Sequence, residues 1–166
     1  MCNDHFEYCD EPWSGKVAGA IGKGLIAGII GTVAITISQQ IEMNKTGRQP
    51  STTPLQAAQL LLKFKPESDD AIQGLNNLVH FSYGTALGLI RSILKILGIG
   101  GLFATILHIG SVQALAMILL PKMKLAPPVN QWDKKTIQIG LIHHTVYGVV
   151  AGILFDWMSR CVKRKF

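Results

Sequence analysis

Two copies of one pattern, His-x-x-Tyr-Gly-x-x-x-Gly, contain the side chains of this sequence that are best suited to chemistry. The copies occupy residues 80–88 and 144–152. At helical spacing the histidine and the two glycines of each copy share one face. The six residues are His80, Gly84, Gly88, His144, Gly148 and Gly152. An imidazole titrates near neutral pH and can hold a proton or a metal, whereas spaced glycines let a second helix approach closely.

Ionisable and phenolic groups inside long apolar runs form a wider candidate polar site. Its members are His80, Tyr83, His108, His143, His144 and Tyr147. Three roles are open: hydrogen bonds that fix a helix bundle, a His-lined path for protons or a small solute, or a b-type haem between two imidazoles. The haem would lie between His80 and His144, which have equal predicted depth. Apart from haem we expect no cofactor.

The N-terminal residues offer a second and separate possibility. Cys2, His5 and Cys9 form Cys-x-x-His-x-x-x-Cys, and Cys161 would return to the same side after an even number of membrane spans. Four such ligands could hold zinc. The alternative is an acidic tail with unpaired thiols, because the chain has no Cys-x-x-Cys pair. Neither an activated nucleophile nor paired acids occur in the apolar runs, so we expect no catalytic residues and no enzyme.

The composition indicates an integral membrane protein. Of the 166 residues 48% are hydrophobic and only 16% are charged, and the mean hydropathy is +0.30. The formal net charge of +6 does not indicate nucleic-acid binding, because the basic residues flank apolar runs, at the level of lipid headgroups. The expected partner is therefore the lipid bilayer.

We predict an all-α fold with four transmembrane helices after a polar leader, residues 1–14, so that residues 15–166 form one membrane domain. Each apolar run is about as long as the roughly 20 residues that a span requires. The predicted spans are Val17–Ile41, Ile72–Leu97, Leu102–Leu120 and Thr136–Met158.

A short amphipathic helix over Leu55–Phe64, with Thr53 as N-cap and Pro54 in its first turn, is expected to lie on the bilayer surface. Near the end of the last span, Asp156 and Arg160 have the spacing of an ordinary i,i+4 ion pair.

The four spans read as two repeated hairpins, about residues 15–97 and 98–160. The second and fourth spans share the His-Tyr-Gly pattern. The first and third share the spacing of Thr32, Ser38 and Gln40 with Thr105, Ser111 and Gln113. Chance similarity of glycine-rich apolar helices is the alternative. A duplication would relate the halves by an axis along the membrane normal.

Glycines are expected to form the packing seams of the bundle. The first span carries a pair of its own, Gly24 and Gly28. We further expect that the His80 and His144 faces meet, or face a common centre. Thr32, Ser38 and Gln40 are expected to form hydrogen bonds between helices.

Short motifs in the second half of the chain resemble the pattern of YagU-like inner-membrane proteins. They are His80-Phe81-Ser82, Leu107-His108, Pro127-Pro128, Trp132 and His144, within residues 75–158. The resemblance implies a multi-pass protein of a bacterial inner membrane and little about chemistry. Lys and Arg are evenly split between the two predicted sides, and the dense basic C-terminal tail favours both termini in the cytoplasm.

These observations favour a non-enzymatic role, as a helix-packing or accessory subunit that contacts other membrane-protein subunits or a second copy of itself. The alternative is a small channel or transporter for protons or a small solute.

Overall fold

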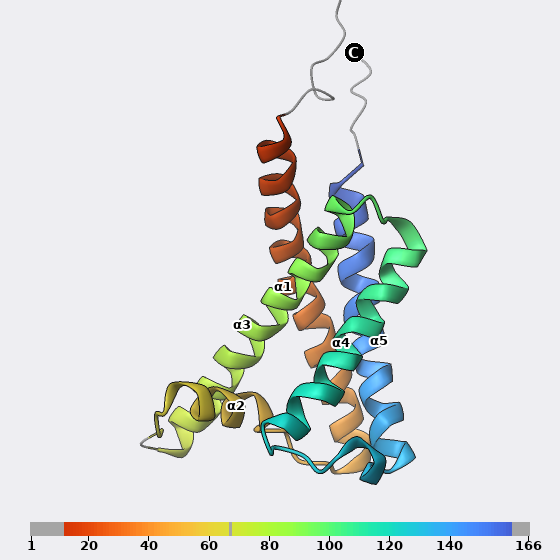
Figure 1. The fold of residues 1–166 in the computed structure, drawn as a ribbon. Coiled ribbons are helices and arrows are strands. Elements are labelled where there is room, and N and C mark those ends of the chain that lie inside the picture. The colour runs from red at the N-terminus through yellow and green to blue at the C-terminus, as the bar shows by residue number, and fades with distance from the viewer. Residues whose placement is uncertain (1–11, 67, 161–166) are drawn as a thin grey trace, which may run out of the picture.

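The computed structural model describes residues 12–66 and 68–160, and all regular structure within this part is helical (Figure 1). Four long helices are joined by short connections that contain a shorter helix, α2 (Thr53–Leu62), and one 3-10 turn, η2 (Val129–Gln131). The long helices are α1 (Trp13–Thr46), α3 (Asp69–Ile96), α4 (Gly101–Lys122) and α5 (Lys134–Met158). The predicted zinc ligands, Cys2, His5, Cys9 and Cys161, lie outside the described residues, as does most of the predicted leader.

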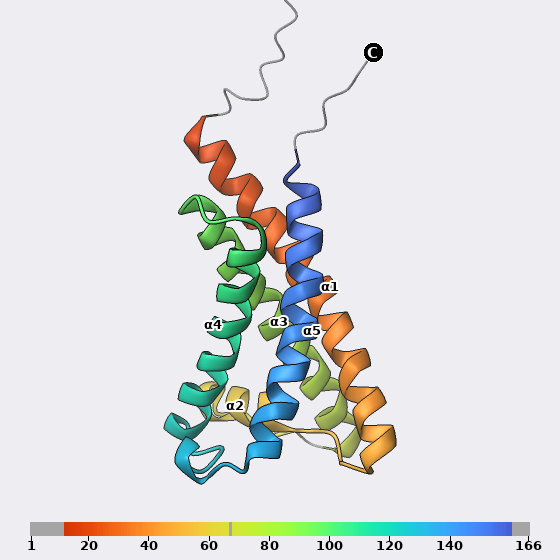
Figure 2. The ribbon, with the colours of Figure 1, turned by 90° about the vertical axis from the view of Figure 1, so that its right-hand side faces the viewer.

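The long helices run lengthwise beside one another, so consecutive long helices are antiparallel (Figures 1 and 2). The start of α1 and the end of α5 lie at one end of the bundle, where α3 also turns into α4. The turn is short because Gly98 and Gly101 adopt positive φ angles of 79° and 61°. The connections that contain α2 and η2 lie at the opposite end. The four predicted apolar runs coincide with the long helices, except that the second run ends at Leu97, one residue beyond α3.

Side-chain caps fix where two of the helices begin. The Ser68 hydroxyl accepts a hydrogen bond from the Ala71 amide at 3.2 Å and caps α3. Asp133 caps α5 in the same way, with its carboxylate 2.8 Å from the Thr136 amide nitrogen. In α2 the N-cap is Thr52 rather than the predicted Thr53, and the helix ends at Leu62, two residues earlier than predicted.

Glycines let α1 and α3 come into backbone contact. Gly24 and Gly28 of α1 lie against Gly88 and Thr85 of α3, and a Cβ atom placed on Gly88 would collide with the Gly24 carbonyl oxygen. The glycine seams predicted from the sequence therefore pack against each other. The physical reason is that two glycine surfaces allow the shortest distance between helix axes.

The glycines of the second His-Tyr-Gly copy pack elsewhere. Gly148 and Gly152 of α5 lie against Ile109 and Thr105 of α4. Of the two predicted arrangements, a direct meeting of the faces and a shared centre, the glycines do not show the first, while Tyr147 of the second copy reaches the Gly84 carbonyl oxygen of the first. Each face instead packs on the helix that precedes it in its own hairpin, because that helix offers the small or flexible side chains that a glycine seam can accept.

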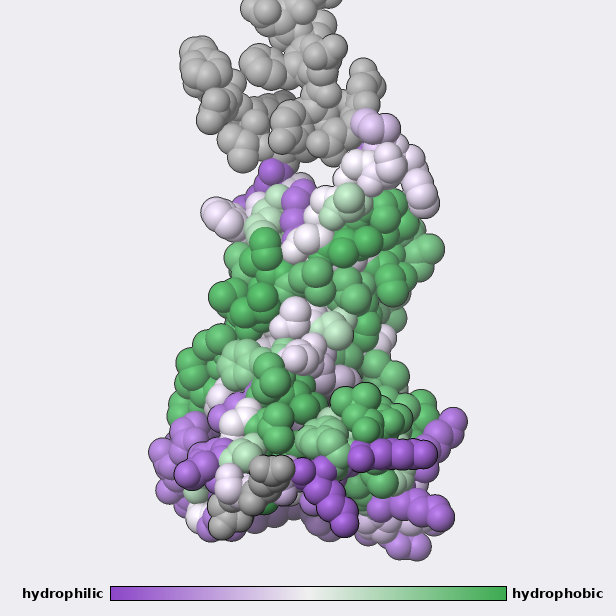
Figure 3. All heavy atoms as spheres, turned by 90° about the vertical axis from the view of Figure 1, so that its left-hand side faces the viewer, coloured by the Kyte–Doolittle hydropathy of each residue, from purple (hydrophilic) through white to green (hydrophobic). Residues whose placement is uncertain are grey.

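Three of the described helices, α1, α4 and α5, are long and apolar enough to cross a membrane. The predicted second span, α3, is not among them, since Asn76, Asn77 and Arg91 interrupt its apolar sequence. On the face shown in Figure 3 hydrophobic side chains cover most of the long helices, and hydrophilic ones gather at the lower end.

Large polar side chains are buried in the bundle, whereas large aliphatic ones lie on its outside. The largest fully buried side chains include Arg91, His108, Thr32 and Ser92, together with Tyr147 and Phe155. Many large aliphatic side chains are instead exposed on all four long helices. The bundle thus has a partly polar interior and an apolar exterior.

Candidate functional site

Four histidines lie in the polar interior, and each is hydrogen-bonded to a long helix other than its own. Nε2 of His80, on α3, lies 3.3 Å from the Thr36 hydroxyl of α1. Nε2 of His108, on α4, lies 3.1 Å from the Leu87 carbonyl oxygen of α3. Because a carbonyl can only accept, the His108 ring must carry its proton on Nε2 in this arrangement.

The two adjacent histidines of α5 diverge, since neighbouring residues of a helix point about 100° apart. Nδ1 of His143 lies 2.9 Å from the Ser38 hydroxyl of α1. Nδ1 of His144 lies 2.6 Å from the Gln113 side-chain oxygen of α4 and donates to it. The four bonds thus join α1 to α3, α3 to α4, α4 to α5 and α5 to α1, which is a closed ring of long helices.

The two tyrosines of the repeated pattern differ in their surroundings. Tyr147 is buried and donates its hydroxyl hydrogen to the Gly84 carbonyl oxygen of α3 at 2.7 Å. Its ring also meets the His108 ring edge-on, with 5.5 Å between the centroids. Tyr83 is 42% exposed and faces outward from α3. The structure therefore brings five of the six predicted site residues into interhelical contacts and leaves Tyr83 on the surface.

An ion pair across the bundle was missed by the sequence analysis. Nη2 of Arg91 lies 2.6 Å from the Asp156 carboxylate of α5, and the Arg91 side chain is only 1% exposed. The expected partner of Asp156 was Arg160, one turn away on its own helix. The available signal was spacing: Arg91 follows Gly84 and Gly88 at helical intervals of seven and three residues, so it shares their inward face.

Of the three polar residues of the first span that were expected to bond between helices, only Ser38 does so. The hydroxyl of Thr32 donates to the Gly28 carbonyl oxygen of its own helix, and the Gln40 amide bonds to Asn44 one turn further on. A hydroxyl that bonds within its own helix leaves no unpaired group in the apolar interior.

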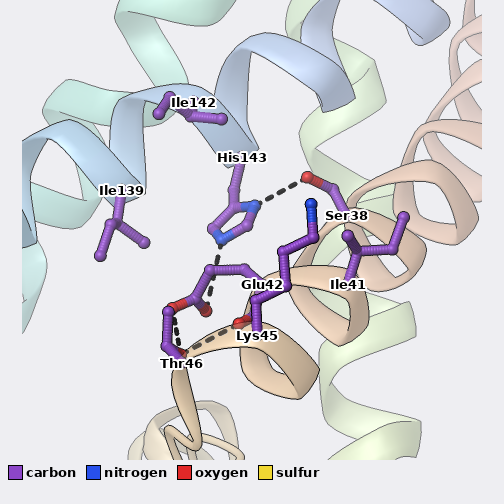
Figure 4. A pocket seen from close by; sticks show the side chains of 8 residues that line it. All are labelled: Ser38, Ile41, Glu42, Lys45, Thr46, Ile139, Ile142 and His143. Atoms are coloured by element: carbon purple, nitrogen blue, oxygen red, sulfur yellow. Dashed lines mark hydrogen bonds and ion pairs between the residues drawn. The ribbon is translucent and has the colours of Figure 1, made fainter.

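A pocket of about 250 Å³ lies between the last turns of α1 and the first turns of α5 (Figure 4). It is lined by Ser38, Ile41, Glu42, Lys45, Thr46, Ile139, Ile142 and His143. Glu42 is not among the site residues predicted from the sequence. Its spacing of four residues from Ser38 and three from Lys45 was the signal for a shared polar face.

Some buried polar atoms in the described part of the chain have no hydrogen-bond partner. They are Nε and Nη1 of Arg91, Nδ1 of His108 and Nε2 of His143. Such atoms are rare because an unpaired buried donor or acceptor costs about 1–3 kcal/mol. They are the positions in this interior where a proton, a water molecule or a ligand would gain most by binding.

No group of three or more potential metal ligands occurs among residues 12–66 and 68–160. No protein-family model, curated protein or solved structure matches the chain.

Proposed function

We propose that the chain is an integral membrane protein that crosses the bilayer four times and acts without catalysis, as a helix-packing or accessory subunit of a membrane assembly. The observation that carries the membrane assignment is the exposure of large aliphatic side chains on all four long helices around a partly polar interior. In water, the exposed aliphatic side chains of all four long helices would be unfavourable, and in lipid they are the expected exterior.

The helix α3 serves as the fourth span in this proposal, although its composition is more polar than that of the others. Two polar side chains in the C-terminal half of α3 point into the bundle. Ser92 donates to the Ala20 carbonyl oxygen of α1 at 2.7 Å, and Arg91 binds Asp156. Its exposed side chains include Leu78, Ile93 and Ile96. A helix that pairs its polar groups internally needs no continuous apolar sequence to span a bilayer.

The ring of four histidine bonds supports a structural role for the imidazoles. In lipid the hydrophobic effect gives little drive to helix association, so packing and interhelical hydrogen bonds hold a bundle together. Both hairpins use the same means, a glycine face and a histidine on their second helix, which also supports the proposed duplication. A bundle whose four long helices are joined by such a ring of hydrogen bonds is expected to be rigid, as a component of an assembly would be.

The proposed setting is a bacterial inner membrane with both termini in the cytoplasm, in line with the resemblance to YagU-like proteins and the basic C-terminal tail. The partners would be other membrane-protein subunits or a second copy of this chain.

Purification of a tagged chain in mild detergent tests the accessory role. We expect a second membrane protein or a defined homo-oligomer to copurify in fixed ratio, and its loss in Gly88→Leu, which breaks the α1–α3 contact. A chain that remains a folded monomer after chemical crosslinking in native membranes would contradict the accessory role.

A second candidate function is a path for protons or a small solute, favoured by the unpaired buried nitrogens. Nδ1 of His108 has no partner, and both Arg91 and Tyr147 lie near this ring in the interior. Liposomes that contain the protein and a trapped pH dye would test this function. Faster dissipation of a pH gradient that is lost in His108→Phe would support conduction, and a rate equal to that of empty liposomes would contradict it.

The haem alternative depends on His80 and His144. Each has one ring nitrogen bonded to a neighbouring helix, to Thr36 and Gln113 respectively, and one ring nitrogen left over. A Soret band in the purified protein that disappears in both His80→Ala and His144→Ala would support haem. Protein that stays colourless after incubation with haemin would exclude it.

A further inference from the structure

We propose that the outward face of α3 around Ser82 and Tyr83 is the contact surface for a second copy of this chain, so that two chains pack through their α3 helices in the membrane. The face also includes Val79 and Ala86, one turn to either side. This inference rests on the proposed function, in which α3 crosses the bilayer, and it selects one of the partners proposed there.

Two hydroxyl groups are exposed at the middle of α3. Ser82 and Tyr83 lie about 20 Å from either end of this helix at a rise of 1.5 Å per residue, so both are near the centre of the bilayer when α3 spans it. Ser82 is exposed, and Tyr83 is 42% exposed. Polar side chains within membrane spans almost always face other helices, and tyrosines that face lipid are enriched at the membrane–water interface. The position of these two hydroxyls therefore indicates that another helix covers them.

The hydroxyl of Tyr83 has no hydrogen-bond partner within the part of the chain that the structure describes. The equivalent tyrosine of the second His-Tyr-Gly copy, Tyr147, is buried and donates to the Gly84 carbonyl oxygen at 2.7 Å. The hydroxyls of Thr32 and Thr36 instead bond to carbonyl oxygens one turn earlier in α1. Tyr83 cannot do this, because its hydroxyl stands at the far end of the ring, away from its own backbone. In lipid an unpaired hydroxyl is unfavourable, so a neighbouring chain that offers an acceptor binds favourably.

A small side chain at the centre of the face lets another helix come close. Ala86 is exposed and follows Ser82 by four residues and Tyr83 by three, so it lies between the two hydroxyls at helical spacing. Val79 has the same relation to them one turn earlier. In membranes helices associate where small residues let their backbones approach and hydroxyls can bond across the contact.

The chemistry of the face favours an identical partner. A hydroxyl both donates and accepts, so a face whose polar groups are hydroxyls can pair with its own copy across a two-fold axis. Residues 71–90 contain no Asp, Glu, Lys or Arg, so two copies do not repel each other there. The helix α3 also has the most to gain from a cover, since only α1, α4 and α5 of the described helices are apolar enough to cross a membrane by composition.

Disulfide crosslinking of the full chain in native membranes tests the inference, in a background where the native cysteines are replaced by serine. Ala86→Cys should form a disulfide-linked dimer of this chain, because the residue lies at the centre of the face. Gly110→Cys is the matched control, since Gly110 is exposed near the middle of α4 and a Cβ atom there meets nothing within 4 Å. It should stay monomeric.

The dissociation constant of the dimer in lipid vesicles, measured by energy transfer between labelled chains, tests the hydroxyl contact. Tyr83→Phe should weaken the dimer about eightfold, as the loss of two symmetry-related interhelical hydrogen bonds implies. Ala86→Leu should abolish dimerisation because it blocks the close approach, and Gly110→Leu should leave the constant unchanged. All three changes are at exposed positions, so the bundle itself keeps its packing.

A dissociation constant that is unchanged in both Tyr83→Phe and Ala86→Leu would overturn this inference and leave the accessory role intact, because the dimer would then use another surface. Crosslinking of Ala86→Cys to a different membrane protein would also overturn it, since the face would belong to another subunit. A folded chain in which no surface crosslinks to any protein would instead overturn the accessory role itself.

Discussion

The absence of a single carbon atom at Gly88 allows α1 and α3 to touch. A Cβ atom there would collide with the backbone of Gly24, which cannot move without displacing α1, whereas a Cβ at Gly110 of α4 would meet nothing within 4 Å. We predict that Gly88→Ala destabilises the bundle by about 1–3 kcal/mol, as overpacking does.

The matched control for this change is Gly110→Ala, which should be neutral or slightly stabilising because alanine favours a helix by about 1 kcal/mol over glycine. Thermal unfolding in detergent compares the two variants. Equal melting temperatures would show that the glycine seam is unimportant for stability.

The ion pair between Arg91 and Asp156 is the other residue-level feature that holds the bundle together. The Arg91 guanidinium also stacks near the Phe155 ring, with 5.6 Å between its central carbon and the ring centroid. We predict that Asp156→Asn lowers stability by about 1.5–3 kcal/mol, the usual contribution of a hydrogen bond to a charged group. Arg160→Gln, at an exposed position four residues away, should have little effect. A larger loss of stability in Arg160→Gln than in Asp156→Asn would instead support the ion pair between Asp156 and Arg160 that the sequence predicted.

At the residue scale, the sequence predicted which side chains matter better than it predicted their partners. The repeated pattern identified His80, Gly84 and their counterparts, because inward faces follow directly from helical periodicity. The contacts of Ser38 with His143 and of Arg91 with Asp156 depend on the relative register of two helices. Local sequence does not encode that register.

At the scale of single elements, the start of α5 depends on an exposed carboxylate. The hydroxyl and amide of Thr136 both donate to Asp133, and these bonds hold the pKa of Asp133 below its ordinary value of 3.8. A lowered folded-state pKa means that this group stabilises the folded protein above its unfolded-state pKa. The contribution is lost as the pH falls through the folded-state pKa.

The variant Asp133→Asn isolates the effect of the carboxylate charge, because asparagine also caps helices but does not titrate. We predict that the melting temperature of the wild type falls relative to that of Asp133→Asn as the pH drops below about 4. A difference that stays constant from neutral pH to acid would show that the cap makes no titrating contribution.

The short helix α2 is suited to lie on the membrane surface. Leu55 is buried against the body of the protein, where Asn76 of α3 accepts a bond from the Leu55 amide at 3.2 Å, whereas Leu60, Leu61 and Leu62 are exposed. We predict that spin labels at positions 61 and 62 are accessible to lipid-soluble oxygen and that a label at Gln56, on another face of the helix, is accessible to a water-soluble reagent. Uniform access of the aqueous reagent along the helix would place α2 in water.

At the scale of the whole molecule, the sequence predicted the number, order and approximate limits of the long helices. Long apolar runs bounded by Pro and Gly are unambiguous signals. The membrane assignment of α3 is harder, because its polar residues lower its apolar character and only the structure shows where Arg91 and Ser92 point. The sequence left open for a related reason whether the two glycine faces meet or face a common centre. Periodicity defines a face but does not say which neighbouring helix that face contacts.

The central claim is that all four long helices cross the membrane, with α3 among them. Its most direct test is the accessibility of single cysteines to a membrane-impermeant thiol reagent in intact cells, in a background where the native cysteines are replaced by serine. We predict that Gly100→Cys is labelled from the same side as a cysteine added after Phe166, and that Gln49→Cys and Asn130→Cys are labelled only from the opposite side. Labelling of Gln49→Cys and Gly100→Cys from the same side would mean that α3 does not span the bilayer and would contradict the account.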